Sequence, residues 1–370
     1  MKVGIFGGSF DPIHEEHIEY VAAAHTALGL DRVIVVPSFV APHKQGGAVA
    51  SGKERLAMCC LAFENFDFVE VSDYELAAGG TSYTYLTCRH FRAAFPDAEL
   101  FFLVGADMLE DFFTWRNPED ILKNVTLAAC GREGKIPAQL HARFVARFGQ
   151  DFIEVPFTGA AVSSTDIRVA LAFGKNPAHV PPRVLQYIDN RKIYRDERIM
   201  RALALEKPPR QEHSFRVAKL ACRRARSLGI PEGQAMLAAG LHDCAKNLPL
   251  NSVLLAGFVP PEGVPEPVMH QYAGAYLAEH LIGVPDAQIL DAIRFHASGR
   301  EDMTPLGKLI YLADLLEEDR RFEGVEELRS LFWKDLDVCL CVALERQLAY
   351  LRSSGQSVYE LTEKAYKWLK

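Results

Sequence analysis

The chain has 370 residues, a formal net charge of −7 and 49% hydrophobic residues, which together favour a globular protein of two domains. The acidic excess is spread evenly, with 19 basic and 23 acidic residues in 1–195 and 22 and 25 in the remainder. Because bulk binding to nucleic acid depends on clustered Lys and Arg, neither half is expected to bind it. A nucleotide-sized ligand needs only a few local cations.

Eight cysteines are present, and none forms a CxxC pair. This usage is typical of reduced thiols in a cytosolic protein rather than of a disulfide framework or a zinc knuckle. The first five residues already resemble a strand, and no run approaches about 18 apolar residues, so we expect neither a signal peptide nor a membrane span. The expected protein is soluble and cytoplasmic, with no membrane partner. The sequence leaves open whether the protein forms a homo-oligomer.

The stretch VGIFGGSFDPIHEEH, residues 3–17, joins an apolar strand to a helix through two glycines. At such a corner the unpaired N–H groups and the positive end of the helix dipole face the same point, which is a natural site for a phosphate. We expect the helix to open near Pro12, so that His14 and His17 share one face. Two imidazoles beside a phosphate can stabilise the charge that grows on its oxygens during group transfer.

Strand and helix patterns alternate through the rest of the first half. Apolar runs predict further strands at 32–37, 68–71, 99–104 and 126–130, with helices between them, as in a parallel sheet of the Rossmann type. Because such sheets bind ligands at the carboxyl ends of their strands, residues that follow strands are candidate contacts. They are Lys44 after the second strand, Gly105 and Asp107 after the fourth, and Arg132 after the fifth.

Two further segments hold candidates. Thr84 lies where a helix opens after a serine, and Trp115 offers a ring that can stack on a nucleobase or a pyridine, with buried packing as the alternative. The run SSTDIR at 163–168 caps a helix start with hydroxyl groups and places Arg168 at the same end. A cap alone is a common feature, so these residues count only in combination.

In order, these elements resemble the nicotinate-nucleotide adenylyltransferases over residues 1 to about 195. The matching segments are the GGSFDPIHEEH run, the P-x-x-x-x-P-H-K loop at 37–44, SYT at 82–84, GADM with Trp115, SSTDIR, and the closing VLQYIDN with IY. Glu16 departs from the signature, which usually has glycine before the second histidine. The shorter pantetheine-phosphate adenylyltransferases share the first motif, but the SYT and GADM elements speak against them.

The resemblance implies in-line attack of the nicotinate mononucleotide phosphate on the α-phosphorus of ATP, with Mg²⁺, to give a dinucleotide and pyrophosphate. His14 and His17 would stabilise the transition state, and Thr84 and Trp115 would face the nicotinate. Ser9, Lys44 and Arg168 would hold phosphates, and Gly105 and Asp107 would face adenosine. The other implied substrate contacts are Gly8, Phe10, Arg132, Ser164 and Thr165.

From Glu197 onward strand-like runs disappear. The pattern predicts helices at 197–206, 211–228, 233–247, 268–282, 286–297 and 304–320, followed by two longer ones. The segment LHDCAK places His242 beside Asp243 in an apolar helix. Burying such a pair without partners is costly, so a cation is the candidate that satisfies both. Asp314 likewise ends an apolar helical run.

A lone HD dipeptide means little, but the order His213, His242-Asp243 and Asp314 resembles the metal-dependent HD phosphohydrolases. HDCAK, HQYAG at 270–274, FHASG at 295–299 and YLADLLEEDR at 311–320 are similar to the bacterial HD-domain hydrolase that cleaves diadenosine tetraphosphate symmetrically to two ADP. That match covers about 196–370. Imidazole and carboxylate ligands suit iron, manganese or another divalent ion, which would lower the pKa of a coordinated water.

For this half we assign His213, His242, Asp243 and Asp314 as metal ligands, and Asp243 also as catalytic. His270 and His296 bind either phosphate or a second ion, and spacing alone does not separate the two. Lys246 and Arg320 are candidate phosphate contacts, with surface charge as a nearly equal alternative.

The sequence thus predicts an α/β Rossmann-like nucleotidyltransferase domain with a parallel sheet at 1–195 and an all-α HD domain at 196–370. The two resemblances imply a bifunctional enzyme that acts on ATP, nicotinate mononucleotide and dinucleoside polyphosphates. Its expected cofactors are Mg²⁺ with ATP and a divalent metal, with iron favoured, in the HD domain. The alternative keeps the first activity and makes the HD domain a nucleotide sensor without turnover.

Overall fold

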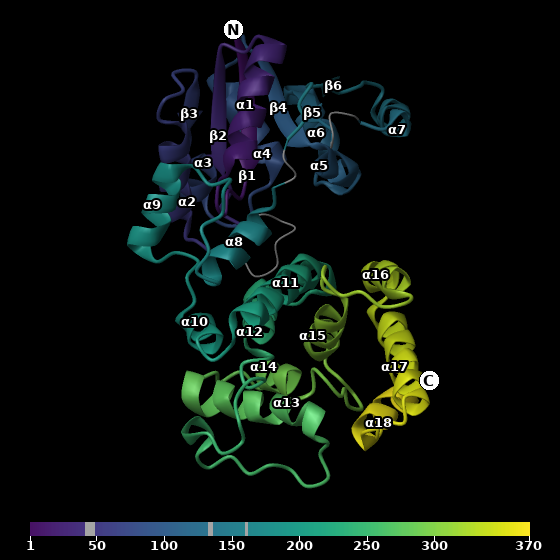
Figure 1. Ribbon diagram of the computed structural model, residues 1–370. Helices are drawn as coiled ribbons and strands as arrows, with labels where there is room; N and C mark the ends of the chain where they lie inside the picture. Colours follow the sequence, from purple (N-terminus) through teal and green to yellow (C-terminus); the bar gives the residue numbers. More distant parts are fainter. Residues whose placement is uncertain (41–48, 132–135, 160–161) are drawn as a thin grey trace. The chain divides into compact units, whose positions relative to one another are not determined.

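A computed structural model describes residues 1–40, 49–131, 136–159 and 162–370, without the side chains of residues 106 and 107 (Figure 1). The chain forms two compact units. The first comprises Met1–Arg168 and Asn176–Tyr194, and the second comprises Val169–Lys175 and Arg195–Lys370. None of the described helices is both long and apolar enough to cross a membrane.

The first unit is built on a parallel sheet with the strand order β3-β2-β1-β4-β5-β6. Its strands are β1 (Lys2–Gly8), β2 (Arg32–Pro37), β3 (Val69–Val71), β4 (Glu99–Gly105), β5 (Thr126–Cys130) and β6 (Ile153–Glu154). Apolar runs predict the first five, whereas β6 has two exposed residues and no pattern to mark it. Because β1 pairs with β2 on one side and β4 on the other, the order of the strands reverses beside β1, where such sheets bind ligands.

Helices connect these strands. They are α1 (Glu15–Leu28), α2 (Gly52–Phe63), α3 (Tyr74–Ala78), α4 (Thr84–Ala94), α5 (Ala106–Asp111), the 3₁₀ turn η1 (Phe112–Thr114), α6 (Pro118–Asn124), α7 (Ala138–Phe148), α8 (Ser164–Ala172) and α9 (Pro182–Arg191). Buried residues of β1, β4 and β5 pack with α4, α6 and α7 to form one core. The division between the two units falls inside α8, after Arg168.

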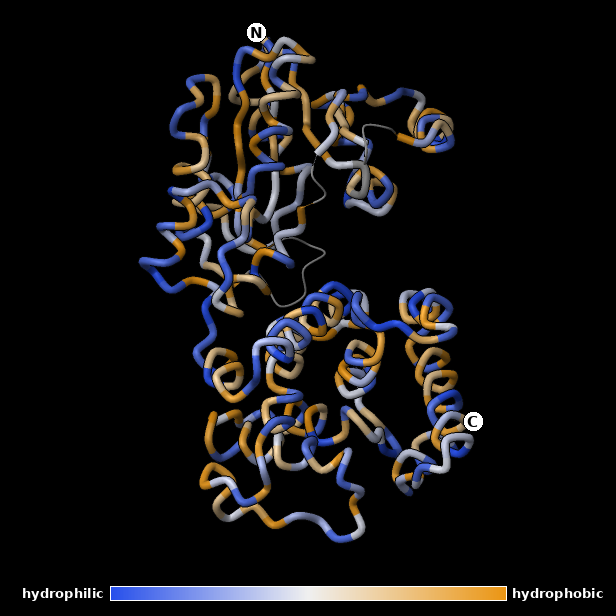
Figure 2. The backbone as a smooth tube through the Cα atoms, viewed as in Figure 1, coloured by the Kyte–Doolittle hydropathy of each residue, from blue (hydrophilic) through white to orange (hydrophobic). Residues whose placement is uncertain are grey.

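Among its described residues, the second unit contains helices joined by turns and loops, and no strand. Its α-helices are α10 (Glu197–Leu203), α11 (Pro208–Ala225), α12 (Glu232–Leu241), α13 (Glu266–Leu277), α14 (Ala287–Arg294), α15 (Pro305–Leu316), α16 (Val325–Lys334), α17 (Leu336–Ser353) and α18 (Glu360–Leu369). Short turns of other types are η3 (Arg226–Leu228), η4 (Val253–Leu255) and η5 (Ala278–Ile282). Three helices follow residue 320 where the sequence pattern predicts two. Hydrophobic and hydrophilic residues alternate around these helices (Figure 2).

Several helices of the second unit end earlier than predicted, among them α15 at Leu316 rather than 320, and two of these early ends precede a histidine. The prediction of a helix over 233–247 is wrong at its end, because α12 stops at Leu241, and that over 286–297 is wrong because α14 stops at Arg294. In each case a histidine just beyond the helix explains the stop: the Nδ1 atoms of His242 and His296 lie 2.7 and 2.8 Å from the carbonyl oxygens three residues before them. The side chain thereby competes for a carbonyl near the helix end.

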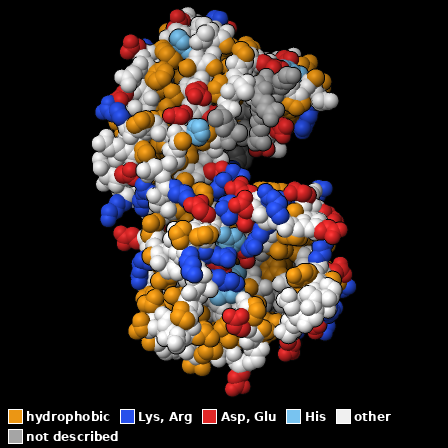
Figure 3. All heavy atoms as spheres, in the orientation of Figure 1, with side chains coloured by type: hydrophobic (Ala, Val, Ile, Leu, Met, Phe, Trp, Pro, Cys, Tyr) orange, Lys and Arg blue, Asp and Glu red, His pale blue; other side chains and the backbone are white. Residues whose placement is uncertain are grey.

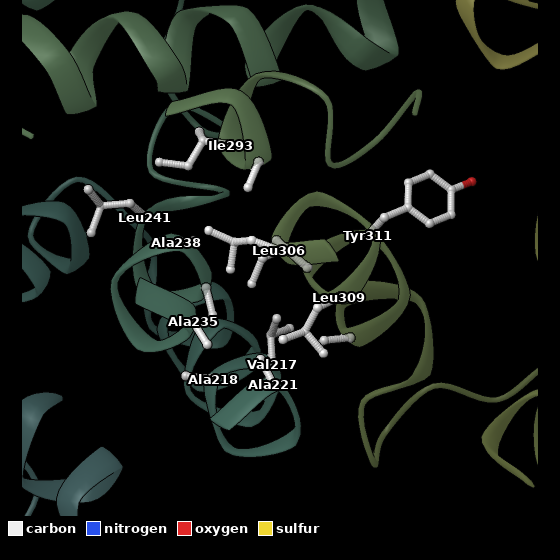
Figure 4. Close-up of a cluster of buried hydrophobic side chains, with 14 of the residues drawn as sticks. Val217, Ala218, Ala221, Ala235, Ala238, Leu241, Ile293, Leu306, Leu309 and Tyr311 are labelled. Atoms are coloured by element: carbon white, nitrogen blue, oxygen red, sulfur yellow. The ribbon is translucent and has the colours of Figure 1, made fainter. Parts of the chain in front are cut away.

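The core of the second unit holds these helix ends in place. Small side chains on α11 and α12, including Ala221 and Ala238, let the two helices approach closely, and Leu306 and Leu309 of α15 fill the space beside them (Figure 4). Leu241 of the same cluster immediately precedes His242. Core packing and the position of this histidine are therefore directly linked.

Candidate active sites

The first candidate site is the corner between β1 and α1. The helix begins at Glu15, not near Pro12 as the sequence suggests, so His14 precedes the helix and His17 lies in its first turn. The two rings face each other with centroids 3.7 Å apart. The backbone N–H of His14 donates to Nδ1 of His17 over 3.3 Å, so a neutral His17 carries its proton on Nε2, where it can donate to an anion.

His14 is buried, and burial, followed by the influence of His179, lowers its pKa to about 4. Among the described residues its Nδ1 atom has no hydrogen-bond partner. A buried, neutral imidazole with an unsatisfied ring nitrogen is poised to bind a polar group of a ligand.

Gly7 and Gly8 end β1, and the chain turns there toward α1. A Cβ atom at Gly8 would lie 2.9 Å from the ring of Phe10, so only glycine fits without movement of that ring. Phe10 has a positive φ of 47° and its buried ring packs on His17 with centroids 5.2 Å apart. The structure therefore places the Phe10 ring in the core beneath His17. Ser9 follows Gly8 at the same turn.

The SSTDIR element docks on this corner. Ser164 donates to the carbonyl of Pro12 over 3.2 Å, and the buried guanidinium of Arg168 donates to the carbonyl of Asp11 and to the hydroxyl of Thr165. The structure thus brings the two distant motifs together, as the sequence suggests. Arg168 is already engaged with protein groups, which ties α8 to the corner.

Glu16, which departs from the family signature, has a defined partner. Its carboxylate accepts a hydrogen bond from the N–H of Val162 over 3.0 Å. It also lies so close to Gly159 that a Cβ atom there would be 2.4 Å from its oxygen. The carboxylate holds the segment that leads into α8.

Two buried side chains of this site, those of Arg55 and Asp11, were not predicted from the sequence. The guanidinium of Arg55 donates to the carbonyls of Ser9 and Ser38, each over 2.6 Å, so it joins the turns after β1 and β2. Asp11 accepts from the N–H groups of residues 49 and 50 and from the hydroxyl of Tyr194. One signal was available: Arg55 occupies a position on the buried face of α2, in register with Met58, Cys59 and Ala62.

Thr84 and Trp115 come from adjacent segments. Thr84 is the first residue of α4, and the guanidinium of Arg116 lies 4.7 Å from the ring of the preceding Tyr83. The Trp115 ring packs against Phe112 with centroids 5.2 Å apart, and its indole Nε1 is buried without a partner among the described residues. Part of the ring is therefore core, and its N–H remains available to a ligand.

The remaining candidates of the first unit lie at strand ends or outside the description. Gly105 ends β4, beside the strand that ends at Gly8. Lys44 and Arg132 lie outside the described residues. Asp107 belongs to α5, but its side chain is not among those described.

The second candidate site forms where several helix ends of the second unit meet. His213 comes from α11, His242 and Asp243 follow α12, and Asp314 lies near the end of α15. Nε2 of His213 is 2.9 Å from Oδ1 of Asp314, and Oδ2 of Asp243 is 3.6 Å from Nε2 of His242. The four predicted ligands converge on one point.

Two further histidines complete the cluster. Nε2 of His270, from α13, and Nε2 of His296 lie 3.3 and 3.4 Å from Oδ1 of Asp243. Two groups have ligand atoms close enough to hold one ion each: His213, His242 and Asp314, and His242, Asp243 and His296. Asp243 directs one oxygen toward each side of the cluster.

The chemistry of this donor set fits a divalent cation. His242 is completely buried and its Nε2 atom has no hydrogen-bond partner among the described residues. Burial lowers the pKa of His242 to about 4, so its ring is neutral and the Nε2 lone pair is available. Although burial opposes ionisation, the hydrogen bond with His213 and the field of His242 hold the pKa of Asp314 well below its usual range. A cation would satisfy both groups.

Basic side chains surround the cluster. Arg320 donates to Oδ1 of Asp314 over 2.6 Å, and the ammonium of Lys246 lies 3.2 Å from Nδ1 of His270. Arg210, which sequence reasoning missed, donates to Oδ2 of Asp243 over 2.8 Å. The available signal was its place one turn before His213 on the same helix face. Figure 3 shows histidines between Lys and Arg side chains on the surface of this unit.

Comparisons with known proteins agree with the two units. The family model described as "Cytidylyltransferase-like" matches residues 5–170, and the model described as "HD domain" matches residues 210–319. A Mycoplasma pneumoniae protein named "Probable nicotinate-nucleotide adenylyltransferase/Ap4A hydrolase" is 32% identical over 363 residues, which cover 94% of this chain and 98% of that protein. A Mycoplasma genitalium protein of the same name is 27% identical and covers 87% of this chain and 89% of its own length.

Solved structures resemble one half each. A Clostridium acetobutylicum protein described as a "predicted HD superfamily hydrolase involved in NAD metabolism" is 29% identical, covers 47% of this chain and 95% of its own, and has a TM-score of 0.42. Plasmodium falciparum nicotinic acid mononucleotide adenylyltransferase, complexed with NaAD, is 21% identical, covers 52% of this chain and 97% of its own, and has a TM-score of 0.44.

Proposed function

Because this chain belongs to the family of the nicotinate-nucleotide adenylyltransferase/Ap4A hydrolases, we propose that it is a bifunctional enzyme. Residues 1–195 transfer AMP from ATP to nicotinate mononucleotide, which gives deamido-NAD and pyrophosphate. Residues 196–370 hydrolyse diadenosine tetraphosphate symmetrically to two ADP. Eight free cysteines are compatible with a place of action in the reducing cytoplasm.

In the transferase site, catalysis rests on positioning and on stabilisation of charge. The mononucleotide phosphate attacks the α-phosphorus in line, and pyrophosphate leaves; Mg²⁺, when bound with ATP, would offset the negative charge of the phosphates. His17, with Nδ1 occupied by the His14 N–H, donates from Nε2 to a phosphoryl oxygen, and His14 stabilises the same charge. No covalent intermediate with the protein is required. The close pairing of the two histidine rings, with centroids 3.7 Å apart, is the observation that carries this assignment.

The other residues of this site hold the substrates. We assign Thr84 and Trp115 to the nicotinate end and Gly105 and Asp107 to adenosine. Arg168 holds the corner through Asp11 and Thr165, next to the phosphates. The remaining phosphate and substrate contacts are Gly8, Ser9, Phe10, Lys44, Arg132 and Ser164.

In the hydrolase site, His213, His242, Asp243 and Asp314 hold a divalent metal, and the mixed imidazole and carboxylate set favours iron. When bound, the metal supplies an activated water and polarises the phosphoryl oxygen. Arg210, Lys246 and Arg320 surround the ligands and bind the phosphate chain, whose negative charge they match. His270 and His296 bind phosphate or a second ion. The convergence of ligands from several helix ends carries this half of the proposal.

The two activities are tested together in the full-length chain. With ATP and nicotinate mononucleotide it should release pyrophosphate, and with Fe²⁺ under anaerobic conditions it should convert diadenosine tetraphosphate to ADP alone. His17→Ala should lower only the first rate, by about 100-fold. Asp243→Asn should abolish only the second.

Each variant is the other's control for folding. An unchanged transferase rate in His17→Ala would refute the role of that histidine. Binding of diadenosine tetraphosphate without ADP formation, at full metal occupancy, would instead support the nucleotide-sensing alternative for the HD domain.

A further inference from the structure

Glu317 is a buried carboxylate just beyond the C-terminal end of α15. Its residue is 2% exposed, and it lies three positions after Asp314. Oε1 is 3.2 Å from Nδ1 of His213, so the end of α15 reaches across to the ring of a candidate ligand on α11. None of the motifs in the sequence assigns a role to this side chain.

His213 needs an acceptor that its own helix does not provide. His242 and His296 lie past the ends of their helices, and each Nδ1 finds a carbonyl three residues earlier. His213 lies inside α11, where backbone carbonyls accept the N–H groups of the following turn. An acceptor for its Nδ1 must therefore come from another element.

The carboxylate of Glu317 is itself held firmly. Its second oxygen, Oε2, accepts from Nε of Arg216 over 2.7 Å and from the N–H of Asp319 over 2.9 Å. Arg329 donates to the carbonyls of Leu316 and Glu317 over 3.0 and 2.7 Å, which braces the backbone on both sides.

The contact with Glu317 determines which ring nitrogen of His213 carries a proton. Because Oε2 of Glu317 already accepts from the guanidinium of Arg216 and the N–H of Asp319, its other oxygen is the acceptor that Nδ1 of His213 meets, and that nitrogen carries the proton. Nε2, which lies 2.9 Å from Oδ1 of Asp314, is then the ring nitrogen left to bind a cation. A fixed tautomer and ring orientation reduce what must be reorganised when the cation binds.

We propose that Glu317 is a positioning residue that fixes the ring orientation and tautomer of His213 for metal binding. The inference rests on the proposed metal site of the HD domain but does not depend on which nucleotide is hydrolysed. Besides His213, Oε1 of Glu317 faces Nε of Arg320 at 3.8 Å, and we assign the effect of Glu317 on metal binding to the shorter contact with His213.

The test compares two neighbouring glutamates in the full-length, metal-free protein. Glu317→Gln keeps the shape of the side chain and removes its charge. Glu318→Gln is the matched control, because that side chain is 62% exposed and only pairs with Lys219 at 3.8 Å. We expect Mn²⁺ to bind Glu317→Gln about 10- to 100-fold more weakly than wild type, and Glu318→Gln within twofold of it. Calorimetric titration with Mn²⁺ measures both.

A second measurement leaves Glu317 unchanged. Nitrogen NMR of the histidine rings in the metal-free protein, with His213→Gln to assign the signal, should show His213 protonated on Nδ1. Equal Mn²⁺ affinity of the two variants, or a His213 ring protonated only on Nε2, would overturn the inference. Wild-type protein that binds Mn²⁺ as expected but hydrolyses no dinucleoside polyphosphate would refute the proposed activity and leave the role of Glu317 standing.

Discussion

At the scale of single residues, Arg55 holds together the turns that form the first candidate site. Its guanidinium binds carbonyls of the turns after β1 and β2 and of Ala50, and Asp11 binds N–H groups of the segment that leads into α2. Ser38 and Ala50 are buried, so their carbonyls would lack this donor if the arginine were lost. The corner between β1 and α1 therefore depends in part on Arg55.

Replacing Arg55 with Met should destabilise the first unit by about 3 kcal/mol or more, because the carbonyls of Ser38 and Ala50 lose their donor and the charge of Asp11 loses a nearby cation. Lys53→Met, at an exposed position of the same helix, should change stability by less than about 0.5 kcal/mol. Urea unfolding followed by the fluorescence of Trp115, with the other tryptophans replaced by phenylalanine, measures the difference. Equal stability of the two variants would show that the carbonyls find other donors.

His14 gives a prediction about pH. Its pKa is about 4 in the folded protein, below the ordinary value of 6.5, because it is buried. Between these values the unfolded chain binds a proton that the folded chain does not, so stability falls as the pH drops from 6.5 through 4, by about 3 kcal/mol in total. His14→Gln should lose this part of the pH dependence. Urea midpoints of the first unit at several pH values test it, and parallel curves for both proteins would contradict it.

At the scale of elements, the positions of helix ends determine where several candidate ligands of the second unit lie. The stop of α12 at Leu241 places His242 and Asp243 in the turn that follows, where the ring of His242 turns back to the helix. α14 does the same for His296. α11 has no such end near His213 and depends on Glu317 instead. Core packing between α11, α12 and α15 sets where these ends meet.

Ala238→Leu tests the link between packing and metal binding. Ala238 is completely buried in the cluster of Figure 4, so a larger side chain should destabilise the second unit by about 1–3 kcal/mol and displace the end of α12. Mn²⁺ affinity should fall with it. Met236→Leu, on the same helix and of similar volume, is the control and should change neither quantity appreciably. Unchanged affinity in a destabilised Ala238→Leu protein would show that the helix end is positioned independently of this core.

At the scale of the whole molecule, the border between the units does not follow the chain. Residues 169–175 belong to the second unit although the first unit resumes at Asn176. Within the second unit, Phe173 packs on Phe215 with ring centroids 5.6 Å apart, and Lys175 pairs with Glu212 at 2.5 Å. A cut beside Asp196 therefore separates Phe173 from its partner.

A fragment of residues 196–370 should accordingly be less stable than the second unit in the full chain, by about 3 kcal/mol, because it lacks the buried Phe173 ring. Phe173→Ala in the full chain should reproduce most of that loss. Thermal unfolding of metal-free fragment, variant and wild type measures it. A fragment as stable as the second unit in the intact protein would show that residues 169–175 contribute little.

Much of this protein follows from its sequence alone. The strand, glycine turn and histidine pair of residues 3–17 lie within a few turns of chain, and their spacing is local, so the corner between β1 and α1 was predictable. β1, β2, β4 and β5 were predictable because buried strands have largely apolar runs, and the partly exposed β3 was predictable from its two valines. The order of His213, His242-Asp243 and Asp314 also sufficed to predict their convergence once the family resemblance supplied the fold.

The tertiary structure decided what depends on distant partners. The sequence marks the helix faces of Arg55 and Arg210, but the roles of these two residues and of Glu317 come from carbonyls, carboxylates and rings that belong to other segments. The exact ends of α12 and α14 depend on side chains that compete for backbone carbonyls, which no periodic pattern records. Periodicity reports which face of an element is buried, but only packing determines what that face meets.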